Sequence, residues 1–134
     1  MTASGESETL EFKRSTAELK SATQTLSAFL NHRGGVLLFG VHDDGRIVGQ
    51  TTAASTLHDI AQEISRIDPA IQPDIFTIPV RDELAVIVVN VGHGRNRPYA
   101  YNGKAFKRIG NTTAELSRDE YNLILLENMH ATDR

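Results

Sequence analysis

The stretch LSAFLNHRGGVLLFGVHDDGRIVG, residues 26–49, contains the end of a helix, a strand and a turn in direct succession. Apolar side chains recur at steps of three and four over residues 16–32, which predicts a helix with one buried face. The pair Gly34-Gly35 ends this helix, because glycine adopts the left-handed cap conformation without steric cost. A helix therefore leads directly into a strand at this point.

The strand expected after the glycines covers residues 35–41 and is continuously apolar, which is typical of a strand covered on both faces. Asp44-Gly45 then predicts a tight hairpin turn, since both residue types accept positive backbone dihedral angles. The return strand is expected to begin at Ile47 and Val48. Residues 26–49 thus predict a helix packed on a sheet.

The same rules predict further elements on both sides of this stretch. They are a strand at residues 10–13, a helix at 53–67, an antiparallel pair of strands at 74–80 and 84–91, a hairpin at 97–110 that turns at Asn102-Gly103, and a helix that begins at Ser117. Ser117 and Glu120 have the spacing of a capping box. The predicted fold class is α+β, a mixed or antiparallel sheet with two to three packed helices.

Length and composition indicate one domain over residues 1–134, with a core at about 6–128 and a frayed tail from His130. The chain contains no cysteine, which excludes disulfides and thiolate zinc sites and suits a cytoplasmic protein. No apolar run approaches the roughly 20 residues of a membrane span, and no signal-peptide pattern is present. We therefore expect no membrane association.

Five cations and no acid lie between Gly92 and Thr113, interleaved with three aromatic residues. The cations are Arg95, Arg97, Lys104, Lys107 and Arg108, and the aromatic residues are Tyr99, Tyr101 and Phe106. Such a segment can bind phosphates and stack on unpaired bases. The alternative is a pair of solvated strands whose aromatic side chains pack inward, and composition alone favours it. The net charge of −3 argues against a chain-wide electrostatic attraction to nucleic acid.

Carboxylates gather in two places, Glu6, Glu8 and Glu11 before the first helix and Asp43-Asp44 at the end of the apolar strand. Carboxylates that converge from different segments commonly hold Mg²⁺ or Mn²⁺ beside a phosphate. A charged strand edge that discourages aggregation is the other interpretation. The five histidines show no ligand spacing, and no phosphate-binding loop follows Gly34-Gly35.

Three segments together resemble, in order and spacing, the Schlafen-type domain that is also called the AlbA-like divergent (AlbA_2) domain. They are ESETLEFKRS at residues 6–15, LSAFLNHRGGVLLFGVHDDGRIVG at 26–49 and PYAYNGKAFKRIGNTTAEL at 98–116. The resemblance covers nearly the whole chain and implies the Schlafen AlbA-like fold. It also implies a domain that binds nucleic acid.

The resemblance implies a catalytic centre as well. In Schlafen proteins three carboxylates form a metal-dependent endoribonuclease site that acts on tRNA and other structured RNA. The matching residues are Glu6, Glu11 and Asp43, which would bind Mg²⁺ or Mn²⁺, and Lys13 would lie near the scissile phosphate. The alternative is a non-catalytic DNA-binding module or transcriptional regulator, and ATP binding finds less support because no phosphate loop is present.

The basic segment would then form the nucleic-acid surface. Its expected contacts are Arg95, Arg97, Lys104, Lys107, Arg108 and Tyr101. Schlafen cores grip a duplex stem between two related lobes, so a chain of this length would need a second copy. We therefore expect a homodimer, with structured RNA as the favoured partner and DNA as the other.

Overall fold

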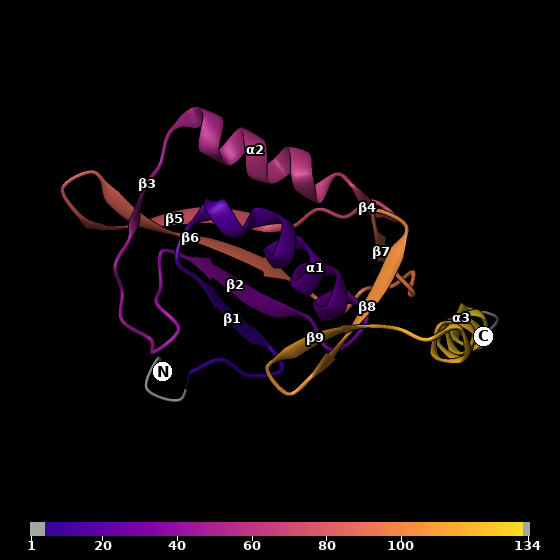
Figure 1. Cartoon of the computed structure of the whole chain (residues 1–134). Coiled ribbons are helices and arrows are strands. Elements are labelled where there is room, and N and C mark those ends of the chain that lie inside the picture. The colour runs from indigo at the N-terminus through magenta and orange to yellow at the C-terminus, as the bar shows by residue number, and fades with distance from the viewer. Residues whose placement is uncertain (1–4, 133–134) are drawn as a thin grey trace.

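The computed structural model describes residues 5–132, with side chains described as far as residue 129. Two sheets surround the central helix α1 (Leu19–Leu30), and a second helix, α2 (Ala54–Ile64), lies beside it (Figure 1). A short helical turn, η2 (Thr16–Glu18), precedes α1, and α3 (Arg118–Thr132) ends the described chain. The predicted α+β fold class is confirmed.

The first sheet is mixed and contains five strands. They are β1 (Leu10–Lys13), β2 (Gly35–Phe39), β3 (Gln50–Thr51), β5 (Asp74–Arg81) and β6 (Leu84–Val91). β1 runs parallel to β2, so that Leu10 lies opposite Val36, and α1 forms the crossover between the two strands. β6 pairs antiparallel with β2, β3 and β5, which makes it the central strand.

The second sheet packs on the other side of α1 and contains four short strands. They are β4 (Ile67–Asp68), β7 (Ala100–Tyr101), β8 (Lys104–Ile109) and β9 (Thr112–Glu115). The hairpin of β7 and β8 turns at Asn102-Gly103, as the sequence predicts, and Asn102 has a positive φ of 51°. β9, which the sequence analysis did not predict, pairs antiparallel with β8.

The glycine pair between α1 and β2 allows two close backbone approaches. Gly34 has a φ of +83°, and its N–H donates to the carbonyl of Phe29 over 2.8 Å. A Cβ at Gly34 would lie 2.6 Å from the carbonyl oxygen of Val91, and one at Gly35 would lie 2.7 Å from the ring of Phe29. β2 can therefore begin directly beneath the helix only because both side chains are absent.

The main core lies between α1, α2 and the two sheets. Phe29, Leu37, Phe39, Ile60, Ile87 and Val89 are each fully buried there. Packing of the α1 apolar face against both sheets makes this helix the centre of the fold. None of the helices within residues 5–132 has both the length and the apolar content of a membrane span.

The opposite face of the first sheet carries a smaller apolar cluster to which no helix contributes. Phe12, Val41, Val86 and Val88 are buried in it. Farther along the same face, Phe76 and Ile78 lie opposite Val88 and Val86 and are each 50% exposed. The expectation that β2 is covered on both faces was therefore wrong for this second face, where Leu38 is only half-buried.

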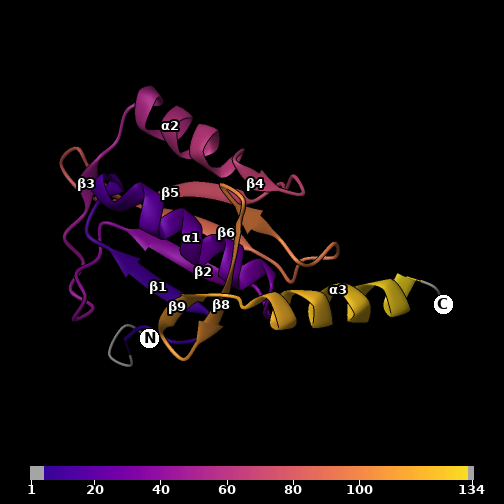
Figure 2. The same cartoon turned by 45° about the vertical axis from the view of Figure 1, so that its right-hand side comes forward.

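Helix α3 extends away from the two sheets in both views (Figures 1 and 2). The predicted capping box forms, since the Glu120 N–H donates to Ser117 Oγ and the Ser117 N–H donates to Glu120 Oε1. Leu123 and Leu126, three residues apart, are more than half exposed. The helix continues through Thr132, the fraying expected from His130 stays a prediction, and residues 133–134 lie outside the described part.

The hairpin after β2 differs from the expected one. Val41 and Ile47 form an isolated bridge, but residues 47 and 48 form no strand, and the chain next pairs at β3, with β6 and not with β2. The N–H groups of Val48 and Gly49 both donate to the carbonyl of Gly40, which folds the segment back on itself. This loop brings Asp43 close enough to Glu6 for their charges to interact.

Candidate functional site

Glu11 lies on the α1 face of β1 and is only 7% exposed. Its two oxygens bind two different cations: Arg108 Nη2 lies 2.8 Å from Oε1, and Lys13 Nζ lies 3.1 Å from Oε2. A buried carboxylate is stable in a folded protein when opposite charges and hydrogen bonds surround it in this way. Glu11 is therefore part of a buried ion network.

Arg108 connects β8 to the start of β1. Its guanidinium donates to the carbonyls of Ser7 and Leu10 and to Thr113 Oγ1, besides Glu11. The guanidinium carbon also lies 5.2 Å from the centroid of the Phe29 ring, a cation–π distance. Each of the three guanidinium nitrogens has a hydrogen-bond partner, and the residue is 6% exposed. Arg108 therefore stabilises the contact between β8 and β1.

The other candidate carboxylates lie near Glu11. Glu6 Oε2 accepts a hydrogen bond of 2.8 Å from the Phe12 N–H, which holds the side chain against β1. Burial raises the pKa of Glu6 above its ordinary value, and the neighbouring negative charges of Glu11 and Asp43 raise it further, whereas the Phe12 N–H and Lys13 lower it. The structure thus brings Glu6, Glu11, Asp43 and Lys13 into one electrostatic neighbourhood.

A hard divalent cation needs several carboxylate oxygens that converge on one point. Among the residues with described side chains, no three His, Asp or Glu groups converge closely enough to hold a metal ion. Both Glu11 oxygens bind cations, and one oxygen of Glu6 accepts from the backbone. As they are placed, Glu6, Glu11 and Asp43 do not fit Mg²⁺ or Mn²⁺, which require several free carboxylate oxygens.

Three of the expected nucleic-acid contacts are accessible. Arg95 is exposed in the loop after β6, and Arg97 in the same loop is half-buried. Within the described residues, the buried Nε of Arg97 has no hydrogen-bond partner. The side chain of Lys104, at the start of β8, is 65% exposed and lies 3.9 Å from a Glu115 oxygen. These three cations are available to a polyanion.

The other three expected contacts have partners within the chain. Lys107 donates to Glu120, and this bond, with the Ser117 N–H, lowers the pKa of Glu120 to about 2. Tyr101 is 3% exposed and donates to Glu63, and burial together with that carboxylate raises the pKa of Tyr101 to about 12. We correct the expectation for Tyr101 and Arg108: their burial prevents contact with nucleic acid.

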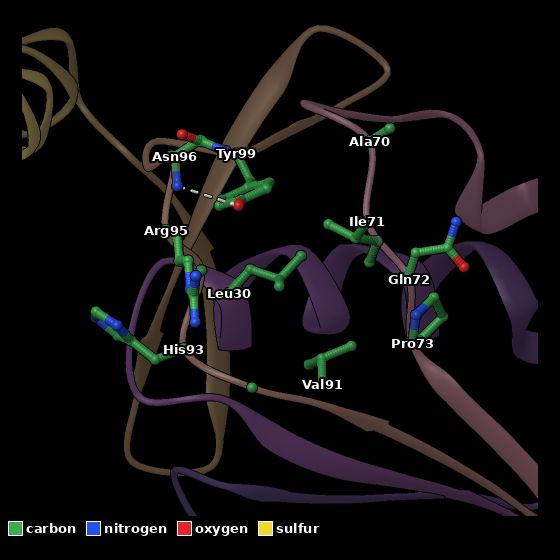
Figure 3. Close-up of a pocket in the computed structure, with 12 residues that line it drawn as sticks. Leu30, Ala70, Ile71, Gln72, Pro73, Val91, His93, Arg95, Asn96 and Tyr99 are labelled. Carbon is green, nitrogen blue, oxygen red and sulfur yellow. Dashed lines mark hydrogen bonds between the residues drawn. The ribbon is translucent and has the colours of Figure 1, made fainter.

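A pocket lies beside the accessible arginines (Figure 3). Its volume is about 690 Å³, and its walls are the loop after β6 and the segment before β5. Leu30 at the end of α1 and Val91 at the end of β6 lie between these walls. No local sequence pattern predicts this pocket, because its two walls are separated in the chain by the β5–β6 hairpin.

The comparisons with known proteins identify the family. The profile described as Schlafen, AlbA_2 matches residues 6–117 of the chain. The chain belongs to this family. Among curated proteins, none matches the sequence.

Two solved structures resemble this Schlafen AlbA_2 domain. The crystal structure of the DIP2311 protein from Corynebacterium diphtheriae aligns with a TM-score of 0.64 and 20% identity, over 85% of this chain. This chain spans 26% of that one. The solution structure of the N-terminal domain of a protein from Nitrosomonas europaea, named as related to the ATP-dependent DNA helicase RecG, aligns with a TM-score of 0.54 and 25% identity, over 82% of this chain and 80% of that one.

Several residues of the Schlafen AlbA_2 motifs have structural roles that the sequence analysis missed. Asn31 is buried at the end of α1, where its amide donates to the carbonyls of Tyr99 and Phe106 and accepts from the Tyr99 N–H. Thr113 bonds both Arg108 and Thr25 of α1. A polar residue in the last turn of an otherwise apolar helix face is the available signal for a role such as that of Asn31.

Proposed function

We propose that this Schlafen AlbA_2 domain binds nucleic acid through the loop after β6 and the adjoining end of β8. The observation that carries the proposal is the grouping of accessible Arg95, Arg97 and Lys104 in a stretch, residues 92–113, that contains no acid. Phosphates bind to such clusters with release of counterions, whatever the net charge of the chain. The resemblance to the N-terminal domain of a helicase-related protein supports the same proposal.

Structured RNA is the favoured partner and DNA the alternative. The assigned cations Arg95, Arg97 and Lys104 lie on a loop and on a strand and not on a helix, so recognition by shape and backbone contacts is expected. A transcriptional regulator that binds DNA would use the same three cations. Competition between tRNA and duplex DNA of equal charge distinguishes the two partners.

The finer proposal is metal-dependent cleavage of tRNA or other structured RNA, with Glu6, Glu11, Asp43 and Lys13 in the catalytic centre. It rests on the family resemblance and on the electrostatic proximity of the four residues. Because the carboxylates are not arranged as a ligand set, we assign no catalytic step to a metal. The Lys13 ammonium has three N–H donors, so it can donate to a phosphate while it remains paired with Glu11, and its side chain is 14% exposed.

The binding test compares two arginine variants by fluorescence anisotropy with labelled tRNA and duplex DNA. Arg95→Gln should weaken binding severalfold. It should also reduce the slope of the logarithm of the binding constant against the logarithm of the salt concentration by about one. Arg81→Gln is the matched control, since Arg81 is an exposed arginine at the opposite end of the β5–β6 hairpin, about 24 Å from the loop along the eight residues of β6. Equal affinities for the two variants would contradict the assigned surface.

The cleavage test incubates tRNA with the protein in Mg²⁺, in Mn²⁺ and in chelator. Asp43→Asn is the appropriate inactive variant, because Asp43 is exposed and within reach of Glu6 electrostatically. Metal-dependent fragments that disappear with Asp43→Asn would support an endoribonuclease. Retarded but intact tRNA with both proteins would support a non-catalytic binding module.

A homodimer is part of the proposal, and two exposed apolar surfaces support it. One is the outer sheet face at Phe76 and Ile78, and the other is the side of α3 that carries Leu123 and Leu126. In a twofold dimer, α3 of each copy would cover the sheet face of the other.

A further inference from the structure

The pocket beside Arg95 has an apolar interior of a size that suits a planar ring. Leu30 and Val91 form its base, and Ile71 and Pro73 form the wall that faces the loop after β6 (Figure 3). Pockets of about 300–1,000 Å³ hold small ligands, and the volume of about 690 Å³ falls within this range. Removing the two faces of an aromatic ring from water between such side chains is favourable.

The rim of the pocket is polar and cationic. His93, Arg95 and Asn96 line one side, and Gln72 lies on the other. No acid is among the twelve lining residues. Carboxamides can both donate and accept, which matches the edge of a nucleobase, whereas a guanidinium matches a phosphate. The pocket thus combines the three kinds of contact that one nucleotide requires.

The shape of this loop is fixed from within. The Tyr99 ring is 4% exposed, its hydroxyl accepts from the Asn96 N–H over 3.2 Å, and its backbone is held by Asn31. The Gly94 N–H donates to the Leu30 carbonyl over 3.0 Å, and a Cβ at Gly94 would lie 2.2 Å from the Tyr99 ring. Because these contacts already fix the loop, ligand binding does not incur the entropy cost of ordering it.

The pocket mouth has a positive electrostatic environment. Burial lowers the pKa of His93, and the neighbouring cation Arg97 and the ring of His32 lower it further. Glu8, in the N-terminal segment, forms a hydrogen bond with His32 and an ion pair with Arg33, which offsets part of the positive charge there. An anion at the mouth would offset the positive charge of Arg95 on the rim and of Arg97 beside His93.

We propose that this pocket holds a single unpaired nucleotide of a bound strand, with the base between Leu30 and Ile71 and its phosphate at Arg95. The inference rests on the proposed nucleic-acid binding and specifies which feature of the nucleic acid is recognised. A paired and stacked base cannot enter, because both of its faces and its hydrogen-bonding edge are occupied in the duplex. The protein would therefore prefer a loop, bulge or end over a continuous duplex.

The test uses two hairpins that differ only in whether one 2-aminopurine is bulged or paired. We expect about tenfold tighter binding of the bulged hairpin and a change in its fluorescence on binding, the size of effect that one buried base gives. Ile71→Asp should abolish the preference and the fluorescence change while leaving the affinity for the paired hairpin near the wild-type value. Gln72→Ala, at an exposed position, is the second variant if Ile71→Asp does not fold.

Histidine resonances provide a readout that does not depend on affinity. Binding of the bulged hairpin should raise the pKa of His93, whereas Arg81→Gln should leave both the preference and this shift unchanged. Equal affinities for the two hairpins, with no effect of Ile71→Asp or Gln72→Ala, would overturn the proposal that the pocket holds a nucleotide. The proposed function would remain intact. Failure to bind either hairpin at low salt would overturn both.

Discussion

Arg108 and Glu11, 97 positions apart in the sequence, form a buried ion pair in which Nη2 lies 2.8 Å from Oε1. This pair joins the second sheet to the first strand of the first sheet beneath α1. The two residues belong to the first and the last of the family segments, so the order of those segments corresponds to a contact in the fold. Glu11 therefore has a structural role besides any role in chemistry.

Glu11→Gln should destabilise the protein by about 3 kcal/mol, because it leaves the Arg108 charge buried with its ionic partner removed. Urea denaturation measures the change. Glu8→Gln is the control, since Glu8 bonds Arg33 and His32 at the surface and its loss should cost less than about 1 kcal/mol. Similar costs for the two variants would contradict the buried network, and a loss of activity in Glu11→Gln alone is no proof of catalysis.

Glu6→Gln should slightly stabilise the protein at neutral pH. The pKa of Glu6 is raised above 4.5 in the folded state, so its contribution to stability is fully present below 4.5 and is lost as the pH rises through the folded value. The amide can still accept from the Phe12 N–H. We expect a gain of less than about 1 kcal/mol at pH 7, since the side chain is partly solvated, and none near pH 3. A loss at pH 7 would be contrary to this account.

Lys107→Met should raise the pKa of Glu120 from about 2 toward 4.5, because the Lys107 bond is the largest cause of its depression. The Ser117 N–H remains and should keep the value below 4.5. The contribution of Glu120 to stability is present above 4.5 and is lost as the pH falls toward 2. Carboxyl carbon chemical shifts across this range measure the change, and Lys104→Met, which should have no effect on Glu120, is the control.

The homodimer can be tested by cross-linking, because the chain has no cysteine of its own. A Phe76→Cys, Leu126→Cys double variant should form disulfide-linked dimers under mild oxidation. Either single variant should do so far less, because the proposed interface brings position 126 to position 76 of the other copy. Leu126→Glu should shift sedimentation toward one chain mass. A wild-type mass of one chain at micromolar concentration would rule the dimer out.

Local patterns were sufficient to predict much of the fold. The range 10–13 for the first strand, the β5–β6 pair and the turn at Asn102-Gly103 depend on near-neighbour chemistry, and the structure has them. β9 was missed because Thr112–Glu115 is short and weakly apolar and pairs only in the presence of β8. The segment after β2 was predicted as a strand because backbone bonds to a single carbonyl, that of Gly40, leave no trace in composition.

The candidate site was only partly predictable. Arg108 was expected among the surface cations, although it lies two residues after Phe106 and therefore on the same face of β8. That alternation was an available signal for burial. By contrast, the convergence of Glu6 and Asp43, like the two walls of the pocket, depends on tertiary packing of distant segments, and no local pattern contains it.

The pairing of Glu11 with Arg108 also has a consequence for synthesis on the ribosome. Chains are made from the N-terminus at about 5–20 residues per second, so Glu11 exists for several seconds before Arg108 is added. During this time β1 can pair with β2, but the carboxylate between β1 and α1 lacks its arginine. Chains that stop before β8 should therefore have an unpaired Glu11 carboxylate and a less stable β1. Proteolysis of stalled nascent chains should decrease once residues 104–115 have left the exit tunnel.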